Sequence, residues 1–297
     1  MSDNTKTILK ALLVMALWGS LFPMVKLSYS CLGIESSAIN QILLFAGIRF
    51  FVCGIIIIAI GSMREKGEKQ GVKKAIVPIL FVGLFSIILH YTFTYICLSL
   101  TDGGKTAILK QLGVLLYICF GFLFFKDEKF SALKISGALI GFAGIAAMNF
   151  NGSGFKFNLS DTMIIGASLC TVAGSVFSKK AMENASPIMT TGISQFFGGV
   201  VLIVVSLMFG KTGMVITAKG IGVFAYICVA SMVAYCMWNS IIKKAQLSKM
   251  FLIKFAEPVF ACIFGAMILG EQIFSWNYLV SFLLIALGIT MGNIKKS

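Results

Sequence analysis

The chain has 297 residues, of which 58% are hydrophobic and 12% are charged, and its mean hydropathy is +0.96. A soluble domain of this length could not bury so much apolar surface, so the composition predicts an integral membrane protein. It excludes a soluble catalytic or nucleic-acid-binding domain, and we attribute the net charge of +14 to orientation in the membrane instead of to a nucleic-acid partner.

Ten apolar stretches follow one another along the chain, each close to the length of about 20 residues that a membrane-spanning helix needs. They are residues 8–28, 38–60, 76–98, 105–125, 132–150, 162–180, 187–208, 220–241, 250–269 and 275–293. The first has no small-residue cleavage pattern after it, so we expect a retained helix and not a signal peptide. The predicted fold class is all-α integral membrane with ten transmembrane helices.

The lysines and arginines favour one side of the membrane. We place 17 of the 25 on the side of the N-terminus. The other side receives Lys105, Lys156, Lys211 and Lys219, and four more (Lys26, Arg49, Lys110 and Lys254) fall within or at the edge of spans. Since cytoplasmic connections carry the positive excess, this bias predicts a multi-pass protein of the cell membrane with both termini in the cytoplasm.

The chain contains an internal repeat. Residues 104–149 align without a gap on residues 248–293, and ten of the 46 positions are identical, among them Lys110 and Lys254. Chance would give about three or four matches in so apolar a sequence. We therefore expect two five-helix repeats, residues 1–150 and 151–297. Because five crossings are an odd number, the second repeat must be inverted, an arrangement typical of carriers.

Several motifs carry a family resemblance. Trp18-Gly19 lies in the first span, Glu257-Pro258-Val259-Phe260 in the ninth, Leu269-Gly270-Glu271 closes the ninth, and the last helix is spaced with glycines. This pattern resembles the EamA repeat of the drug/metabolite transporter superfamily. The resemblance implies ten helices, cytoplasmic termini, a central cavity, and export or exchange of small metabolites, often amino acids.

The first repeat departs from these motifs. It carries Gly113-Val114 where the second carries Glu257-Pro258, and Lys126-Asp127-Glu128 where the second carries Leu269-Gly270-Glu271. Gly113 and Pro258 stand where some transporters have broken helices. We nevertheless expect both spans to be unbroken.

Charge inside the membrane is costly and usually serves a task. Glu257 is the acidic residue deep in a span, three residues from Lys254, so the two share a helix face and can form an ion pair. Such a pair could simply stabilise the ninth helix. The functional interpretation is that Lys110 and Lys254 meet across the pseudo-twofold axis and attract a substrate carboxylate, while Glu257 receives a proton or a substrate ammonium group.

Two further candidates are a basic residue and the chain's one histidine. Arg49, matched to Gln195 in the second repeat, either lines the same cavity or pairs with a helix-end carbonyl. His90 is either a hydrogen-bonding residue between helices or a proton relay.

The remaining candidates are neutral. We expect Trp18, Tyr91 and Tyr235 to supply cavity walls and Asn40, Gln111 and Gln195 to supply hydrogen bonds, while Trp238, near a helix end, is assigned to the interfacial aromatic belt. Glu271 and Asp127 fall at span ends, where we expect them to fix loop or gate geometry.

The function predicted from these residues is secondary transport of a small polar metabolite by alternating access. A channel, or a membrane-embedded enzyme acting on a lipid-like substrate, remains an alternative, although the chain lacks the clustered carboxylates or the nucleophile and base that such chemistry ordinarily needs. We expect no catalytic residues, no metal and no cofactor. The expected partners are a small-molecule substrate and the lipid bilayer, with the protein a monomer or a homodimer.

Overall fold

The computed structural model describes residues 3–35, 37–64, 69–100, 109–126, 128–149, 159–208, 210, 213–271 and 276–293. Within these ranges the regular elements are all helices. The first half contains α1 (Asp3–Leu32), α2 (Ile39–Arg64), α3 (Lys69–Val82), the π-helix η1 (Gly83–Leu89), α4 (His90–Leu100), α6 (Leu112–Phe124) and α7 (Ala132–Asn149). The second half contains α8 (Leu159–Ala181), α9 (Pro187–Met208), α10 (Ala218–Ile242), α11 (Leu247–Lys254), α12 (Ala256–Leu269) and α13 (Trp276–Asn293).

Eight helical segments of the described chain are long and apolar enough to cross a membrane. Two of these segments join several elements, since 70–94 runs through α3, η1 and part of α4, and 247–269 joins α11 to α12. Two shorter apolar helices, 112–123 and 132–147, occupy the fourth and fifth predicted spans. The all-α fold with ten spans is therefore confirmed.

The two halves are inverted relative to one another. Helices α2 and α9, which occupy equivalent positions in the two repeats, lie against each other over much of their length. Gly54 of α2 faces Phe196 of α9, and Gly61, further along α2, faces Met189, which is earlier in α9. Equivalent helices thus run in opposite directions, as a pseudo-twofold axis in the membrane plane requires.

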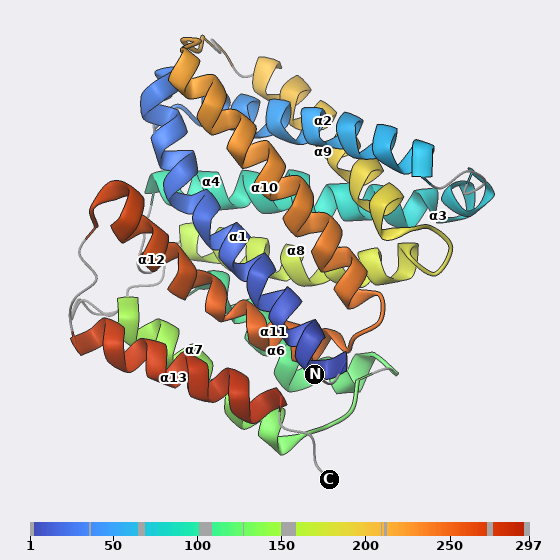
Figure 1. Cartoon of the computed structure of the whole chain (residues 1–297), viewed down its shortest axis with the longest axis vertical. Coiled ribbons are helices and arrows are strands. Elements are labelled where there is room, and N and C mark those ends of the chain that lie inside the picture. Colours follow the sequence, from blue (N-terminus) through green and yellow to red (C-terminus); the bar gives the residue numbers. More distant parts are fainter. Residues whose placement is uncertain are drawn as a thin grey trace.

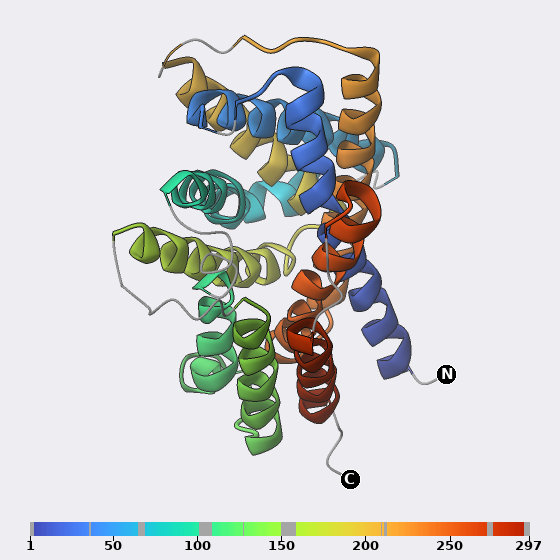
Figure 2. The ribbon, with the colours of Figure 1, turned by 90° about the vertical axis from the view of Figure 1, so that its left-hand side faces the viewer.

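The same symmetry relates the other contacts. Helix α1 lies against α10 and α12, and its counterpart α8 lies against α3, η1, α4 and α6. The pair α2–α9 lies toward one end of the long axis of the molecule and the pair α7–α13 at the other (Figure 1, Figure 2). In Figure 1, α1 begins and α13 ends toward the same, right-hand side of the bundle.

Candidate substrate-binding site

Spans four and nine are each interrupted one residue after a lysine. In the second half, α11 ends at Lys254 and α12 begins after Phe255. In the first half, Gln111 separates the helical residue Lys110 from α6. The two interruptions are related by the repeat, because 255 − 111 = 144 is also the separation of the two lysines. Our expectation that these spans are unbroken is wrong.

The two interruptions leave backbone groups with different partners. In the ninth span, Pro258 has no N–H, so it cannot donate the helical hydrogen bond to the carbonyl of Lys254. In the fourth span, the N–H of Gly113 donates to Ser168 Oγ at 2.7 Å, and this hydroxyl donates to the carbonyl of Lys110 at 2.5 Å. A serine from α8 therefore satisfies the groups that the break exposes.

Lys254 is a buried ammonium held by aromatic rings. It is 8% exposed, and its Nζ lies 5.0 Å from the ring centre of Trp18 and 5.5 Å from that of Trp238. Among the described residues it makes no hydrogen bond and no ion pair, so the predicted pair with Glu257 is absent. The break after Lys254 removes the continuous helix on which the three-residue spacing relied. The charges of Glu257 and Lys110 still act on Lys254 electrostatically.

Lys110, the repeat mate of Lys254, meets the same helix. Its Nζ lies 4.9 Å from the ring centre of Phe22, and Phe22 follows Trp18 by four residues in α1. Residues at this spacing share one face of a helix. Helix α1 therefore presents neighbouring aromatic rings to the two symmetry-related ammonium groups.

Tyr91 and Tyr235 meet at the pseudo-twofold axis. Their hydroxyl oxygens are 3.4 Å apart, and the residues are 144 positions apart in the chain. The ring of Tyr235 lies 5.4 Å from that of Trp18, and both tyrosine rings contact Phe50. The guanidinium of Arg49, which is 2% exposed, lies over the rings of Phe50 and Tyr91 at 4.2 and 5.2 Å. These contacts join Arg49 to the aromatic group around Lys254.

His90 begins α4 and faces α8. Its Nδ1 lies 3.1 Å from the carbonyl oxygen of Ala167 and 3.1 Å from the hydroxyl oxygen of Thr171. The charges of both Lys110 and Lys254 act on the imidazole electrostatically. His90 is therefore both a contact between helices and a neighbour of the charged group.

The three candidate amides lie in different places. Gln111 is buried at the interruption next to Lys110. Gln195 is 0% exposed on α9, and both polar atoms of its amide are enclosed without a hydrogen-bond partner in the described chain. Asn40 lies at the start of α2, where its backbone carbonyl accepts a hydrogen bond from Ser206 Oγ at 2.7 Å. It stands nine positions before Arg49, which is about 13 Å along a helix, so Asn40 lies well away from the guanidinium of Arg49.

Sequence reasoning misplaced one residue and missed others. The assignment of Trp238 to the interfacial belt is wrong, because it is 4% exposed and its ring lies 5.4 Å from that of Trp18. Phe22, Phe50 and Thr171 were not predicted as part of the group. The four-residue spacing of Trp18 and Phe22 was the signal that could have indicated Phe22.

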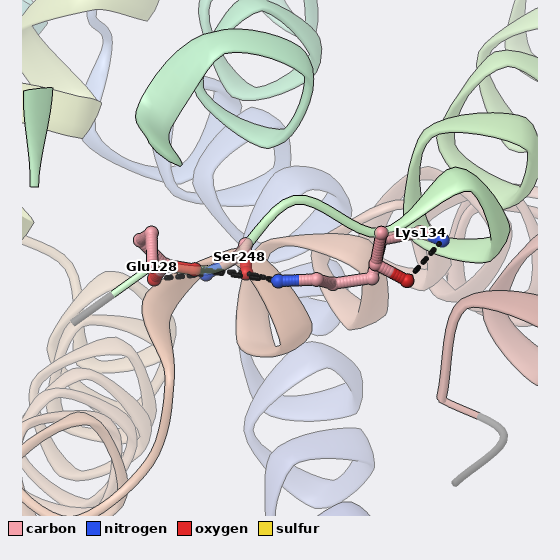
Figure 3. A network of polar contacts seen from close by, with 4 residues as sticks. Glu128, Lys134 and Ser248 are labelled. Carbon is pink, nitrogen blue, oxygen red and sulfur yellow. Dashed lines mark hydrogen bonds and ion pairs between the residues drawn. The ribbon is translucent and has the colours of Figure 1, made fainter. Parts of the chain in front are cut away.

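A buried polar network closes one end of the ninth span. The hydroxyl and N–H of Ser248, in the first turn of α11, donate to the two carboxylate oxygens of Glu128, the N–H at 3.1 Å. Lys134 Nζ donates to Ser248 Oγ at 2.8 Å and lies 3.5 Å from Glu128 (Figure 3). This network ties the connection between α6 and α7 to α11, whose other end carries Lys254.

An exposed ion pair stands at the other end of the ninth span. Lys26 of α1 and Glu271, just after α12, are 2.9 Å apart, and their side chains are 67% and 45% exposed. Asp127, predicted together with Glu271 to fix loop or gate geometry, lies outside the described residues. The ninth span is thus joined to α1 at one end and to the connection between α6 and α7 at the other.

These features define a membrane-embedded helical protein made of two inverted repeats, with lysines at two symmetry-related helix breaks. The model of the EamA-like transporter family matches residues 5–150 and again residues 158–293. The chain belongs to this family.

Named relatives are distant but match over most of their length. The chain is 23% identical to the uncharacterized transporter YvbV of Bacillus subtilis, over 99% of this chain and 93% of that protein. It is 25% identical to protein PecM of Dickeya dadantii, over 86% of each. A solved crystal structure matches with a TM-score of 0.76 at 18% identity, over 97% of this chain and 96% of that chain, which supports the fold.

Proposed function

We propose that the protein is a secondary carrier that exports or exchanges a small polar metabolite, an amino acid or a related compound, by alternating access. In this proposal the repeats 1–150 and 151–297 move against each other around a site between them. The inverted contacts of α2 with α9 support this mechanism, because exchanging the conformations of two inverted repeats converts a site open to one side into a site open to the other.

The observation that carries the proposal is the environment of Lys254. A buried ammonium costs free energy unless an oxygen or a negative charge compensates it. Here aromatic faces surround it, the charge of Glu257 acts on it without forming an ion pair, and Lys110 adds a second positive charge. A substrate carboxylate would supply the missing acceptor. Glu257 would then receive the ammonium group of an amino acid, or a proton.

The other candidate residues have supporting roles in this proposal. Trp18, Tyr91 and Tyr235 form flat walls for an organic solute, Arg49 adds positive charge, and the polar residues provide hydrogen bonds. The polar residues assigned this role are Gln111, Gln195, Asn40 and His90. We place the protein in the cell membrane with both termini in the cytoplasm, as the lysine distribution predicts.

Counterflow in proteoliposomes tests the proposal. Protein reconstituted into liposomes loaded with unlabelled amino acids should take up labelled amino acid saturably, and Lys110→Ala and Lys254→Ala should each lower this uptake at least tenfold. Lys244→Ala is the matched control, because it removes an exposed lysine beyond the end of α10 and should transport normally.

Three outcomes would contradict it. Normal transport by both lysine variants would remove the anion subsite. A conductance that does not saturate would indicate a channel, and a chemically altered solute would indicate an enzyme.

A further inference from the structure

The third span contains a π-helix, and the equivalent eighth span does not. Seven residues, Gly83–Leu89, form the π-helix η1, and α4 begins directly after it with His90. The equivalent span of the second repeat is α-helical from Ala218 to Ile242, and the residue 144 positions after His90 is the buried Ala234. π-Helical turns are rare and frequently mark functional sites. His90 therefore breaks the symmetry of the repeats where the two lysines keep it.

The contacts of His90 determine which of its ring nitrogens carries a proton. The carbonyl oxygen of Ala167 can only accept, so the Nδ1 at 3.1 Å from it must donate. The hydroxyl of Thr171 donates to the same carbonyl at 3.3 Å, which leaves its lone pairs to face Nδ1. The carbonyl thus requires an N–H at Nδ1, and the hydroxyl of Thr171 can accept from it. In a neutral imidazole the lone pair is then on Nε2.

Nε2 has no hydrogen-bond partner among the described residues, and the side chain of His90 is only partly buried. The groups whose charges act on the ring are the ammonium groups of Lys110 and Lys254, which can donate but not accept. Ala167, whose carbonyl accepts from Nδ1, precedes Ser168, whose hydroxyl donates to the carbonyl of Lys110 at 2.5 Å. Adjacent residues of α8 therefore contact His90 and Lys110, and Nε2 is an acceptor near the lysine pair.

We propose that His90 is a specificity-determining residue, whose Nε2 accepts a hydrogen bond from an ammonium or hydroxyl group of the solute while Lys110 and Lys254 hold its anionic group. The inference rests on the proposed function and narrows its substrate class to 2-amino and 2-hydroxy acids. The corresponding acid with hydrogen at carbon 2 leaves Nε2 unpaired and binds about three- to tenfold more weakly, the effect of one hydrogen bond.

The first test measures which ring nitrogen of His90 carries the proton. Because the chain has one histidine, protein labelled with ¹⁵N-histidine and carrying a tag without histidine gives one pair of imidazole nitrogen signals in NMR. We expect the Nδ1 signal of a protonated nitrogen and the Nε2 signal of a lone-pair nitrogen. A proton on Nε2, in either the other tautomer or the imidazolium, would overturn the proposal.

The second test separates recognition from a structural role. Asparagine places its amide near the position of Nδ1, and glutamine places its amide near Nε2, so His90→Asn can keep the bond to Ala167 and His90→Gln can keep the acceptor. The probes are alanine, phenylalanine and glutamate. Each is compared with the 2-hydroxy acid of the same skeleton and with the acid that has only hydrogen at carbon 2, and the readout is the ligand-induced rise in Tm.

We expect the wild type and His90→Gln to prefer the amino and hydroxy acids, and His90→Asn to lose the preference for the hydroxy acids, which carry no ammonium group for Glu257 to receive. A preference for the hydroxy acids that survives in His90→Asn, or that is absent from the wild type although the acids bind, would overturn the role of His90 alone. If none of the nine compounds stabilises the wild type, the proposed function fails for this class of solute and the inference fails with it.

Discussion

Replacing Lys134 by methionine should destabilise the protein strongly, because it removes one partner of a buried ion pair. The side chains of Lys134 and Glu128 are 7% and 3% exposed. Methionine fills much of the volume of the lysine stem and does not replace its charge. The carboxylate of Glu128 would keep its contacts with Ser248 and lose its positive neighbour.

Burial sets the size of this effect. Removing one partner of a buried pair costs about 3–5 kcal/mol, since the other charge is left uncompensated. An exposed pair contributes about 0–1 kcal/mol. At about 2–4 °C per kcal/mol, Lys134→Met should lower Tm by roughly 6–20 °C.

Thermal unfolding in one detergent, followed by intrinsic fluorescence, measures the difference. Lys26→Met is the matched control, because it breaks the exposed pair with Glu271 and should shift Tm by about 4 °C or less. The double variant Lys134→Met/Glu128→Gln removes the orphaned charge as well, and should be more stable than Lys134→Met alone.

Two results would refute the reasoning. Equal shifts for Lys134→Met and Lys26→Met would mean that burial does not strengthen the pair. A double variant no more stable than Lys134→Met would mean that an uncompensated carboxylate is not the source of the loss.

Two further predictions concern contacts between helices, both measured as changes in Tm in the same detergent. Gly137→Ala should destabilise the protein by about 1–3 kcal/mol, because the added Cβ would overlap the carbonyl oxygen of Gly288 and force α7 from α13. The control Gly222→Ala, where nothing lies within 4 Å, should be neutral or slightly stabilising. Equal losses of stability in the two variants would contradict the close approach of α7 to α13. Asn239→Ala should cost about 1 kcal/mol, because it removes the buried bond from Asn239 Nδ2 to Thr191 Oγ1 at 2.8 Å; an unchanged Tm would exclude that bond.

Much of the candidate site could be inferred from the repeat. The offset of 144 made Lys110 and Lys254 equivalent, and it related Tyr91 to Tyr235, whose hydroxyls lie 3.4 Å apart in the structure. A duplicated sequence predicts such pairs because residues on or near a twofold axis meet their own mates. It makes no such prediction for His90, whose counterpart in the second repeat is Ala234.

The predicted ion pair of Lys254 with Glu257 is absent from the described part of the structure, and spacing along the sequence does not show where a helix is interrupted. Their three-residue spacing predicts a contact only on a continuous helix. The helix is interrupted at Phe255, and the ammonium of Lys254 faces Trp18 and Trp238 instead of forming an ion pair with Glu257.

Hydrophobicity and the internal repeat by themselves determined that this chain crosses a membrane ten times in two inverted halves, because both can be read directly from the order of residues along the chain. The tertiary structure alone decided that Lys254 lies between aromatic rings, that Trp238 is buried, and that His90, which directly follows a π-helix, lies against α8. Those contacts join residues far apart in the chain, and they depend on the rotation and position of whole helices, which no local pattern specifies.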